Sequence, residues 1–111
     1  MKTFTSIEQS KKLVDILPLE SADMIFQLGE NKYADSIRVP LTKKHWGQMM
    51  PDIIPCWSLA ALLNILPSST LDSSDDHHYR VHCRERFTEW HDNAIDSCVE
   101  MIIRLHDKGL L

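Results

Sequence analysis

Apolar and polar residues separate most completely in the C-terminal stretch, residues 90–111. On a helical wheel of about 100° per residue, the apolar residues fall in one arc slightly wider than half the wheel; they are Ala94, Ile95, Cys98, Val99, Met101, Ile102, Ile103 and Leu105. A face of this width predicts a helix that lies flat against a sheet or between two other elements. Asp92 or Asn93 can cap its start, and Gly109 suits the left-handed position after its end. His106 falls on the apolar arc, so we expect it to be half-buried and bonded to a carbonyl.

The N-terminal half predicts one helix and a hairpin. Thr5 followed by Glu8 forms a capping-box pattern and predicts a helix over residues 5–17 that Pro18 ends. From Ala22 the pattern alternates as in a strand, residues 29–32 are turn-forming, and a second alternating run follows from Tyr33.

The second half predicts a helix, a loop and a third strand before the C-terminal helix. Residues 58–66 are apolar on nearly every side, which predicts a buried central helix that Pro67 ends. Residues 68–76 are small, polar and acidic, which indicates a surface loop. They resemble the start of an EF-hand calcium loop, but His77 and Cys83 stand where that loop needs glycine and glutamate. Alternation returns between residues 77 and 90 and predicts the third strand.

These elements predict the α+β class, with a small antiparallel sheet of about three strands packed by three helices in the order α-β-β-α-β-α. We expect the third strand to pair beside the hairpin. The length of 111 residues suits one domain over residues 1–111.

Net charge and composition limit the classes of binding partner and the cellular compartment that we expect for this chain. The net charge is −4 and the 12 basic residues are scattered, which argues against nucleic-acid binding. A protein partner or a homo-oligomer remains compatible with the composition. No apolar run approaches the 18 or so residues that span a bilayer, so we expect no membrane association and a cytoplasmic location.

The histidines and cysteines are the candidate chemical groups. His78 and His82 share one strand face but stand ~13 Å apart, too far to hold one metal ion. The order along the chain leaves open whether His77, His78, His82 and His91 converge.

The three cysteines are widely spaced and include no CxxC pair, which predicts reduced core side chains rather than disulfides. Cys83 and Cys98 fall on apolar faces, whereas Cys56 precedes the central helix, whose dipole can lower a thiol pKa. The alternative function is therefore a small metal-dependent or thiol hydrolase that uses residues 77–91 or Cys56.

Residues 40–56 carry three prolines and predict a long connection that is unusually apolar. One interpretation is that its apolar side chains fold back over the core. The other is that it forms a partner-binding surface, since Trp and Met are common in interfaces; its candidate residues are Lys43, His45, Trp46, Met49 and Met50. We favour a non-enzymatic binding module and expect no catalytic residue, no cofactor and no bound metal.

Three blocks of the sequence resemble a set of short proteins encoded in gut Bacteroidales genomes, their prophages and mobile elements. The blocks are MKTFTSIEQSKKL with LPLESADM, CWSLAALLNILP, and TEWHDNAIDSCVEMIIRLH. Together they make up well over half of the chain, and residues 33–52 and the acidic loop lie outside them. No activity is assigned to these proteins, so the resemblance implies a bacterial, cytoplasmic accessory protein and no catalytic residue.

Overall fold

The chain forms two compact units that each combine helices with an antiparallel sheet. The computed structural model describes residues 2–29, 32–40, 53–83 and 85–111. One unit is Thr5–Ser58, and the other is Met1–Phe4 with Leu59–Leu111. The α+β class is confirmed. The single domain over residues 1–111 stays a prediction.

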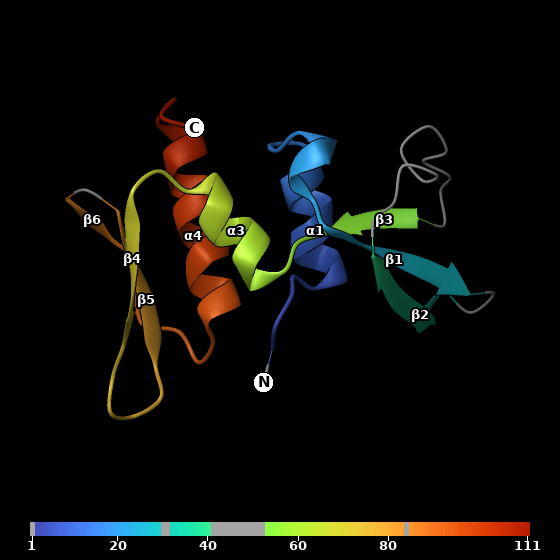
Figure 1. The fold of residues 1–111 in the computed structure, drawn as a ribbon, viewed down its shortest axis with the longest axis horizontal. Helices are drawn as coiled ribbons and strands as arrows, with labels where there is room; N and C mark the ends of the chain where they lie inside the picture. The colour runs from blue at the N-terminus through green and yellow to red at the C-terminus, as the bar shows by residue number, and fades with distance from the viewer. Residues whose placement is uncertain (1, 30–31, 41–52, 84) are drawn as a thin grey trace. The chain divides into compact units, whose positions relative to one another are not determined.

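The Thr5–Ser58 unit contains helix α1 (Ile7–Val14), the short 3-10 helix η1 (Leu19–Ser21) and strands β1 (Met24–Gly29), β2 (Lys32–Pro40) and β3 (Ile53–Cys56). The three strands form one antiparallel sheet in the order β2-β1-β3 (Figure 1). The predicted hairpin is therefore confirmed as β1 and β2.

The start of α1 differs from the predicted capping box. Ser6 caps the helix: its hydroxyl accepts the Gln9 N–H at 3.1 Å, and the Gln9 side chain accepts the Ser6 N–H at 3.0 Å. Thr5 is instead fully buried, and its hydroxyl oxygen accepts the backbone N–H of Trp57 at 3.1 Å. The predicted box failed because Thr5 is used to join the N-terminal segment to the residue after β3.

The end of the predicted long connection is a strand, so the prediction was wrong for residues 53–56. Within β3, Ile54 lies opposite Phe26 and Pro55 opposite Ile25. Pro55 is tolerated because β3 is an edge strand, where a missing N–H need not interrupt a ladder. Helix α1 packs against β3.

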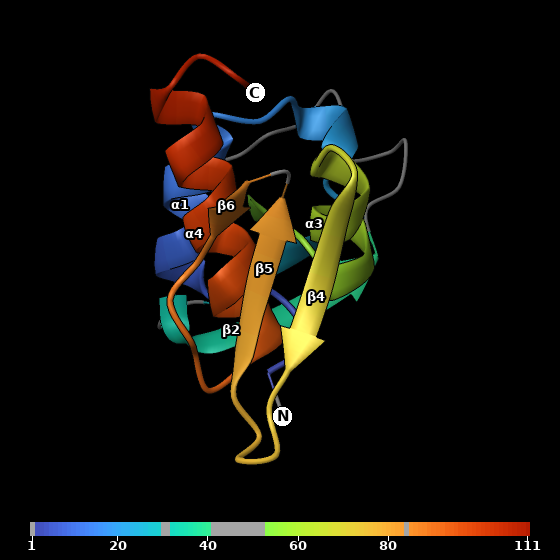
Figure 2. The same ribbon diagram turned by 90° about the vertical axis from the view of Figure 1, so that its left-hand side faces the viewer.

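The other unit contains helix α3 (Leu59–Ile65), strands β4 (Ser69–Ser73), β5 (Tyr79–Cys83) and β6 (Arg86–Phe87), and helix α4 (Ala94–Asp107). The strands form a second antiparallel sheet in the order β4-β5-β6, which lies in front of α4 in Figure 2. The third strand is confirmed as β5. Its predicted pairing beside the hairpin is wrong, because β5 pairs with β4 and β6.

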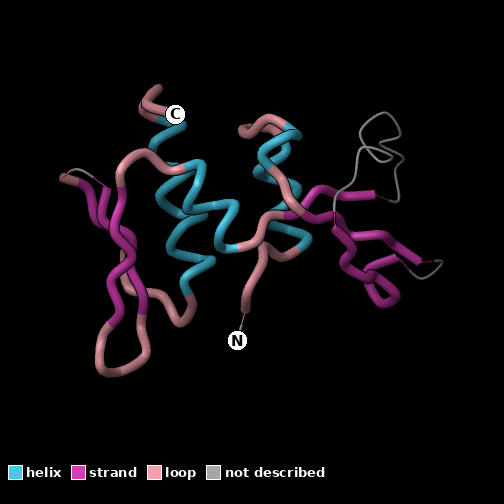
Figure 3. The backbone as a smooth tube through the Cα atoms, viewed as in Figure 1, coloured by secondary structure: helices cyan, strands magenta, loops and turns pink. Residues whose placement is uncertain are grey.

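The surface loop predicted at residues 68–76 is also wrong over most of its length. Residues 69–73 form β4, which makes a hairpin with β5 (Figure 3). Leu71 lies opposite the fully buried Val81, whereas the more exposed Thr70 lies opposite His82. Small polar residues are compatible with such an edge strand once a partner strand supplies the hydrogen bonds, which composition alone does not reveal.

The ends of α4 match the sequence prediction. The Asn93 side chain accepts the Asp96 N–H at 2.9 Å. At the other end Gly109 has φ +70°, its N–H donates to the His106 carbonyl at 3.0 Å, and the Leu110 N–H donates to the Leu105 carbonyl at 2.8 Å. This is the Schellman arrangement, which gives partners to carbonyls that a helix end leaves unbonded.

The apolar face of α4 lies against β5 and α3, as the width of that face predicted. Its fully buried side chains are Ile95, Cys98, Met101 and Ile102, and each such aliphatic side chain contributes about 1.5–3 kcal/mol by burial. The half-buried position expected for His106 is wrong, because residues 106–111 form an exposed terminal segment that the sheet and α3 leave uncovered.

Helix α3 is less buried than predicted. Among its residues only Leu62 is buried, while Ala60 and Asn64 are exposed. One side of this seven-residue helix packs against α4. Its uniformly apolar sequence therefore reflects small and half-exposed side chains rather than a central position.

Candidate interaction surface

The residues predicted to bind a partner lie outside the described residues. They belong to the segment 41–52 and are Lys43, His45, Trp46, Met49 and Met50. Their role stays a prediction.

Three histidines of residues 77–91, His78, His82 and His91, have separate side-chain partners. The Nε2 atom of His78 lies 3.4 Å from a carboxylate oxygen of Asp92. The ring of His82 stacks on Phe87, with ring centroids 4.2 Å apart and planes 4° from parallel. His91 contacts a carboxylate on α4. Within the described residues, no three His, Cys, Asp or Glu side chains are placed to hold a metal ion.

The three cysteines are buried and form no disulfide with one another, as the sequence predicted. Cys56 is fully buried within the core of its unit. Burial raises the pKa of the Cys98 thiol from 9.0 to about 12. A thiol with this pKa keeps its proton at neutral pH and is a poor nucleophile. None of the three therefore presents an accessible thiol at the surface of this structure.

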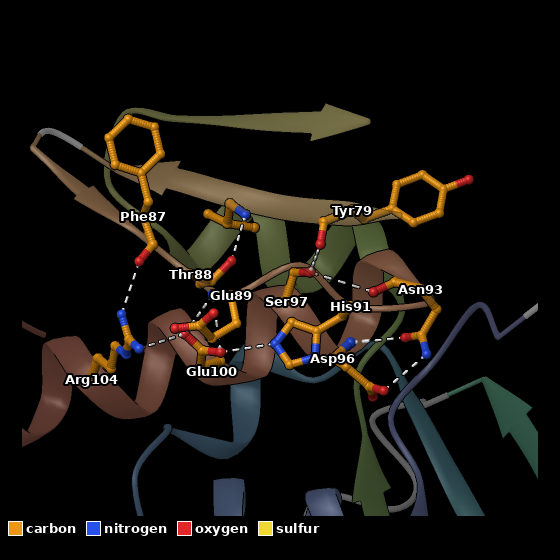
Figure 4. Close-up of polar contacts among 11 residues, drawn as sticks. Tyr79, Phe87, Thr88, Glu89, His91, Asn93, Asp96, Ser97, Glu100 and Arg104 are labelled. Carbon is orange, nitrogen blue, oxygen red and sulfur yellow. Dashed lines mark hydrogen bonds and ion pairs between the residues drawn. The ribbon is translucent and has the colours of Figure 1, made fainter. Parts of the chain in front are cut away.

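Glu100 of α4 holds the segment that follows β6 (Figure 4). Its carboxylate lies 2.8 Å from Nε2 of His91 and 3.1 Å from a guanidinium nitrogen of Arg104, and it accepts the Glu89 N–H at 3.3 Å. Arg104 also donates to the Phe87 carbonyl at 2.8 Å. Two of these contacts, to the Phe87 carbonyl and the Glu89 N–H, thus fix the backbone on either side of residue 88, and a third holds the His91 ring.

Backbone and hydroxyl hydrogen bonds hold the segment after β6, residues 88–91, against β5. The Thr88 hydroxyl oxygen accepts the Val81 N–H at 2.9 Å, and the Thr88 N–H donates to the Val81 carbonyl at 3.0 Å. Two further backbone bonds, at 2.7 and 2.8 Å, join Tyr79 to His91. The buried Ser97 hydroxyl donates to the Tyr79 carbonyl at 2.7 Å. Residues 88–91 are therefore held along the sheet after β6 has ended.

This arrangement assembles an aromatic–arginine cluster of Arg80, His82, Phe87 and Trp90. The Arg80 guanidinium carbon lies 4.6 Å from the Phe87 ring centre and 4.5 Å from the Trp90 ring centre. Its Nε donates to Asp72 at 3.2 Å. Since Val81 and Cys83 are buried on the inner side of β5, the alternate residues Arg80 and His82 lie on the outer face. The outer face thus carries one stacked ring pair, His82 with Phe87, and one cation, Arg80, that contacts both Phe87 and Trp90.

The cluster is both accessible and fixed in place. Phe87 and Trp90 are each 45% exposed. The Arg80 contacts are cation–π contacts, which favour a defined position of the guanidinium over the rings. Trp, Phe and Arg are enriched in protein interfaces, and Trp and Arg often carry much of the binding energy. A partner that covered these side chains would lose little of its binding energy to ordering them.

The sequence alone did not identify this cluster. The alternation from Tyr79 to Cys83 indicates only that Arg80 and His82 lie on the polar face of a strand. Strand alternation alone does not place Phe87 and Trp90 near Arg80 and His82. Only the pairing of β6 with β5, which sets Phe87 opposite His82, brings the rings to this face.

A small apolar pocket lies in the Thr5–Ser58 unit. Its volume is about 230 Å³, and it is lined by Val14, Leu17, Leu19, Pro55 and Trp57. The indole N–H of Trp57 donates to the Ser21 hydroxyl at 3.0 Å, which fixes one wall. The lining suits an apolar group rather than a charged one.

Comparisons with protein-family models, with curated proteins and with solved structures found no match for this chain. In the part of the chain that the structure describes, no helix has the length and apolarity needed to cross a bilayer.

Proposed function

We propose that the chain is a non-enzymatic protein-binding module and that the aromatic–arginine cluster is its principal contact surface. The observation that carries the proposal is the placement of two large aromatic side chains, each 45% exposed, around the Arg80 guanidinium on one sheet face. A monomeric protein gains little from exposing such rings, whereas a partner that buries them gains both apolar area and cation–π contacts.

The support structure behind the cluster also favours binding. Glu100 and Arg104 hold residues 87, 89 and 91 from α4, so the rings are presented by β6 and the anchored segment that follows it. A bacterial, cytoplasmic accessory protein, as the sequence resemblance implies, belongs to the same proposal.

Site-specific photo-crosslinking tests the proposal. A photo-reactive amino acid replaces Trp90 in the full chain expressed in bacteria, and the matched control carries it at the exposed Asp107 of α4. We expect one defined protein to crosslink from position 90 and not from position 107. With that protein purified, Trp90→Ala should weaken binding by about 5- to 30-fold, the range for a residue that contributes 1–2 kcal/mol.

Far-UV circular dichroism and urea unfolding control for the fold, because Trp90 is half-exposed and its replacement should leave the unfolding midpoint nearly unchanged. Equal crosslinking from both positions, or binding that Trp90→Ala does not weaken, would refute the role of the cluster.

A further inference from the structure

The free edge of β4 is the second surface of this sheet that carries a functional prediction. A strand residue directs its N–H and its carbonyl to the same side of the strand, and the side alternates from one residue to the next. Tyr79 and Val81 of β5 bond to His91 and Thr88, on the β6 side. The intervening Arg80 must therefore face β4.

The same alternation fixes which groups of β4 face outward. Arg80 lies opposite Asp72 and His82 lies opposite Thr70, so Asp72 and Thr70 direct their backbone groups toward β5. Ser69, Leu71 and Ser73 alternate with these two residues, so their backbone N–H and carbonyl groups point away from β5. β4 is the last strand of its sheet, and within the described residues no hydrogen bond reaches this outer side.

This edge lacks several of the features that commonly protect an edge strand, although it contains one charged residue, Asp72. Proteins commonly shield such edges with Lys, Pro, a bulge or a very short strand. β4 is five residues long, contains neither Lys nor Pro, and pairs with β5 in continuous register. The opposite edge differs, because β6 has only two residues and is followed by the anchored segment 88–91.

The chemistry around the edge selects one kind of strand. Three aspartates lie along this edge and its turn: Asp72 is paired with Arg80 of β5, whereas Asp75 and Asp76 are exposed, and residues 68–78 contain no Lys or Arg. Leu71 is half-buried on the inner face, opposite Val81. An added strand would place one side chain beside Leu71, and its two neighbours beside Thr70 and Asp72 on the outer face.

We propose that the β4 edge binds an extended basic segment of a partner protein by strand addition, with an apolar side chain beside Leu71 and basic side chains beside Thr70 and Asp72. The backbone groups of Ser69, Leu71 and Ser73 supply the hydrogen bonds, and the aspartates supply the charge preference. This binding uses the backbone edge of β4 rather than the rings of the aromatic–arginine cluster, and the two surfaces adjoin at the Arg80–Asp72 ion pair.

A pair of synthetic peptides tests the geometry. The probe is an acetylated, amidated heptapeptide of alternating Lys and Val that begins and ends with Lys. In the proposed register its Val N–H groups face β4 and its Lys N–H groups face solvent. N-methylation of the three Val residues should therefore abolish binding, whereas N-methylation of three Lys residues should leave it within about threefold.

Amide hydrogen exchange of the full chain, measured by NMR, locates the contact. The peptide should slow exchange at Ser69, Leu71 and Ser73 and leave Thr70 and Asp72, already bonded to β5, unchanged. Ser73→Pro removes one outward N–H and should weaken binding about 3- to 10-fold, whereas the matched Ser73→Ala should change it less than twofold. Unchanged exchange at Arg80 and His82, whose N–H groups face β4, verifies that the Pro variant retains the β4–β5 pairing.

Equal binding of the two methylated peptides would show that the peptide binds by charge and without backbone hydrogen bonds, and would overturn strand addition. So would an absence of binding at millimolar peptide, or new protection only at Thr70 and Asp72. Protection at the three outward amides that rises with protein concentration, without peptide, would assign the edge to a second copy of this chain and overturn the proposed partner. Since Phe87→Ala and Trp90→Ala should leave peptide binding intact, the outcome is independent of the test of the cluster.

Discussion

Replacing Thr88 by Val tests how the aromatic–arginine cluster is anchored. Thr88 is 6% exposed and Val81 is fully buried, so the Val81 N–H depends on the Thr88 hydroxyl oxygen 2.9 Å away. Leaving a buried donor unbonded costs about 1–3 kcal/mol. The added methyl group recovers about 0.8 kcal/mol where it is buried. We therefore expect a net loss of about 0.2–2.2 kcal/mol in the free energy of unfolding.

Thr88→Ser is the matched control, since it keeps the hydroxyl and removes one methyl group, at a cost of about 0.8 kcal/mol. Urea unfolding gives the total loss for each variant, and exchange of the Val81 amide separates the two causes. In the Val variant this amide should exchange about tenfold faster than in the Ser variant, corresponding to about 1.4 kcal/mol. Equal Val81 exchange in the two variants, or an undiminished stability of Thr88→Val, would refute the anchoring role.

Two further substitutions follow from the same helix. Gly109→Ala should lower the free energy of unfolding by roughly 1 kcal/mol, because φ is +70° there, although the added Cβ would meet no atom within 4 Å. Gly109→Asn should cost less stability in a urea titration. An equal cost for the two variants would contradict the left-handed conformation of Gly109. Burial raises the pKa of the Cys98 thiol from 9.0 to about 12, so the unfolded chain loses this proton at lower pH than the folded protein does. The stability that the protonated thiol contributes is therefore complete below about pH 9 and is lost as pH rises toward 12. The urea midpoint should therefore fall more steeply between pH 9 and 11 in the native protein than in Cys98→Ala, and parallel curves would contradict burial of the thiol.

The sequence correctly predicted the elements whose formation depends on interactions between residues close together in the chain. The wide apolar arc of residues 94–105, the Asn93 cap and the Gly109 termination all follow from spacing and backbone preferences within one helix, and all are confirmed. The alternation of Tyr79 to Cys83 likewise predicted β5. These signals depend on neighbours within a few residues.

Where competing local signals were present, contacts from distant residues decided the outcome. Both Thr5 with Glu8 and Ser6 with Gln9 fit a capping box, and the burial of Thr5 against Trp57 leaves the cap to Ser6. Residues 69–73 carry a loop-like composition, and they form a strand because β5 provides a ladder for them.

The sequence by itself thus determined the α+β class, the C-terminal helix with its two ends, the hairpin and the third strand. Only the tertiary structure decided that the described strands form two sheets, that β4 lies at the edge of one of them, and that Phe87 and Trp90 contact Arg80. The physical reason is the range of the interactions. Periodicity and capping act within one or two turns of a helix, whereas strand pairing and ring stacking join residues whose proximity no local pattern encodes.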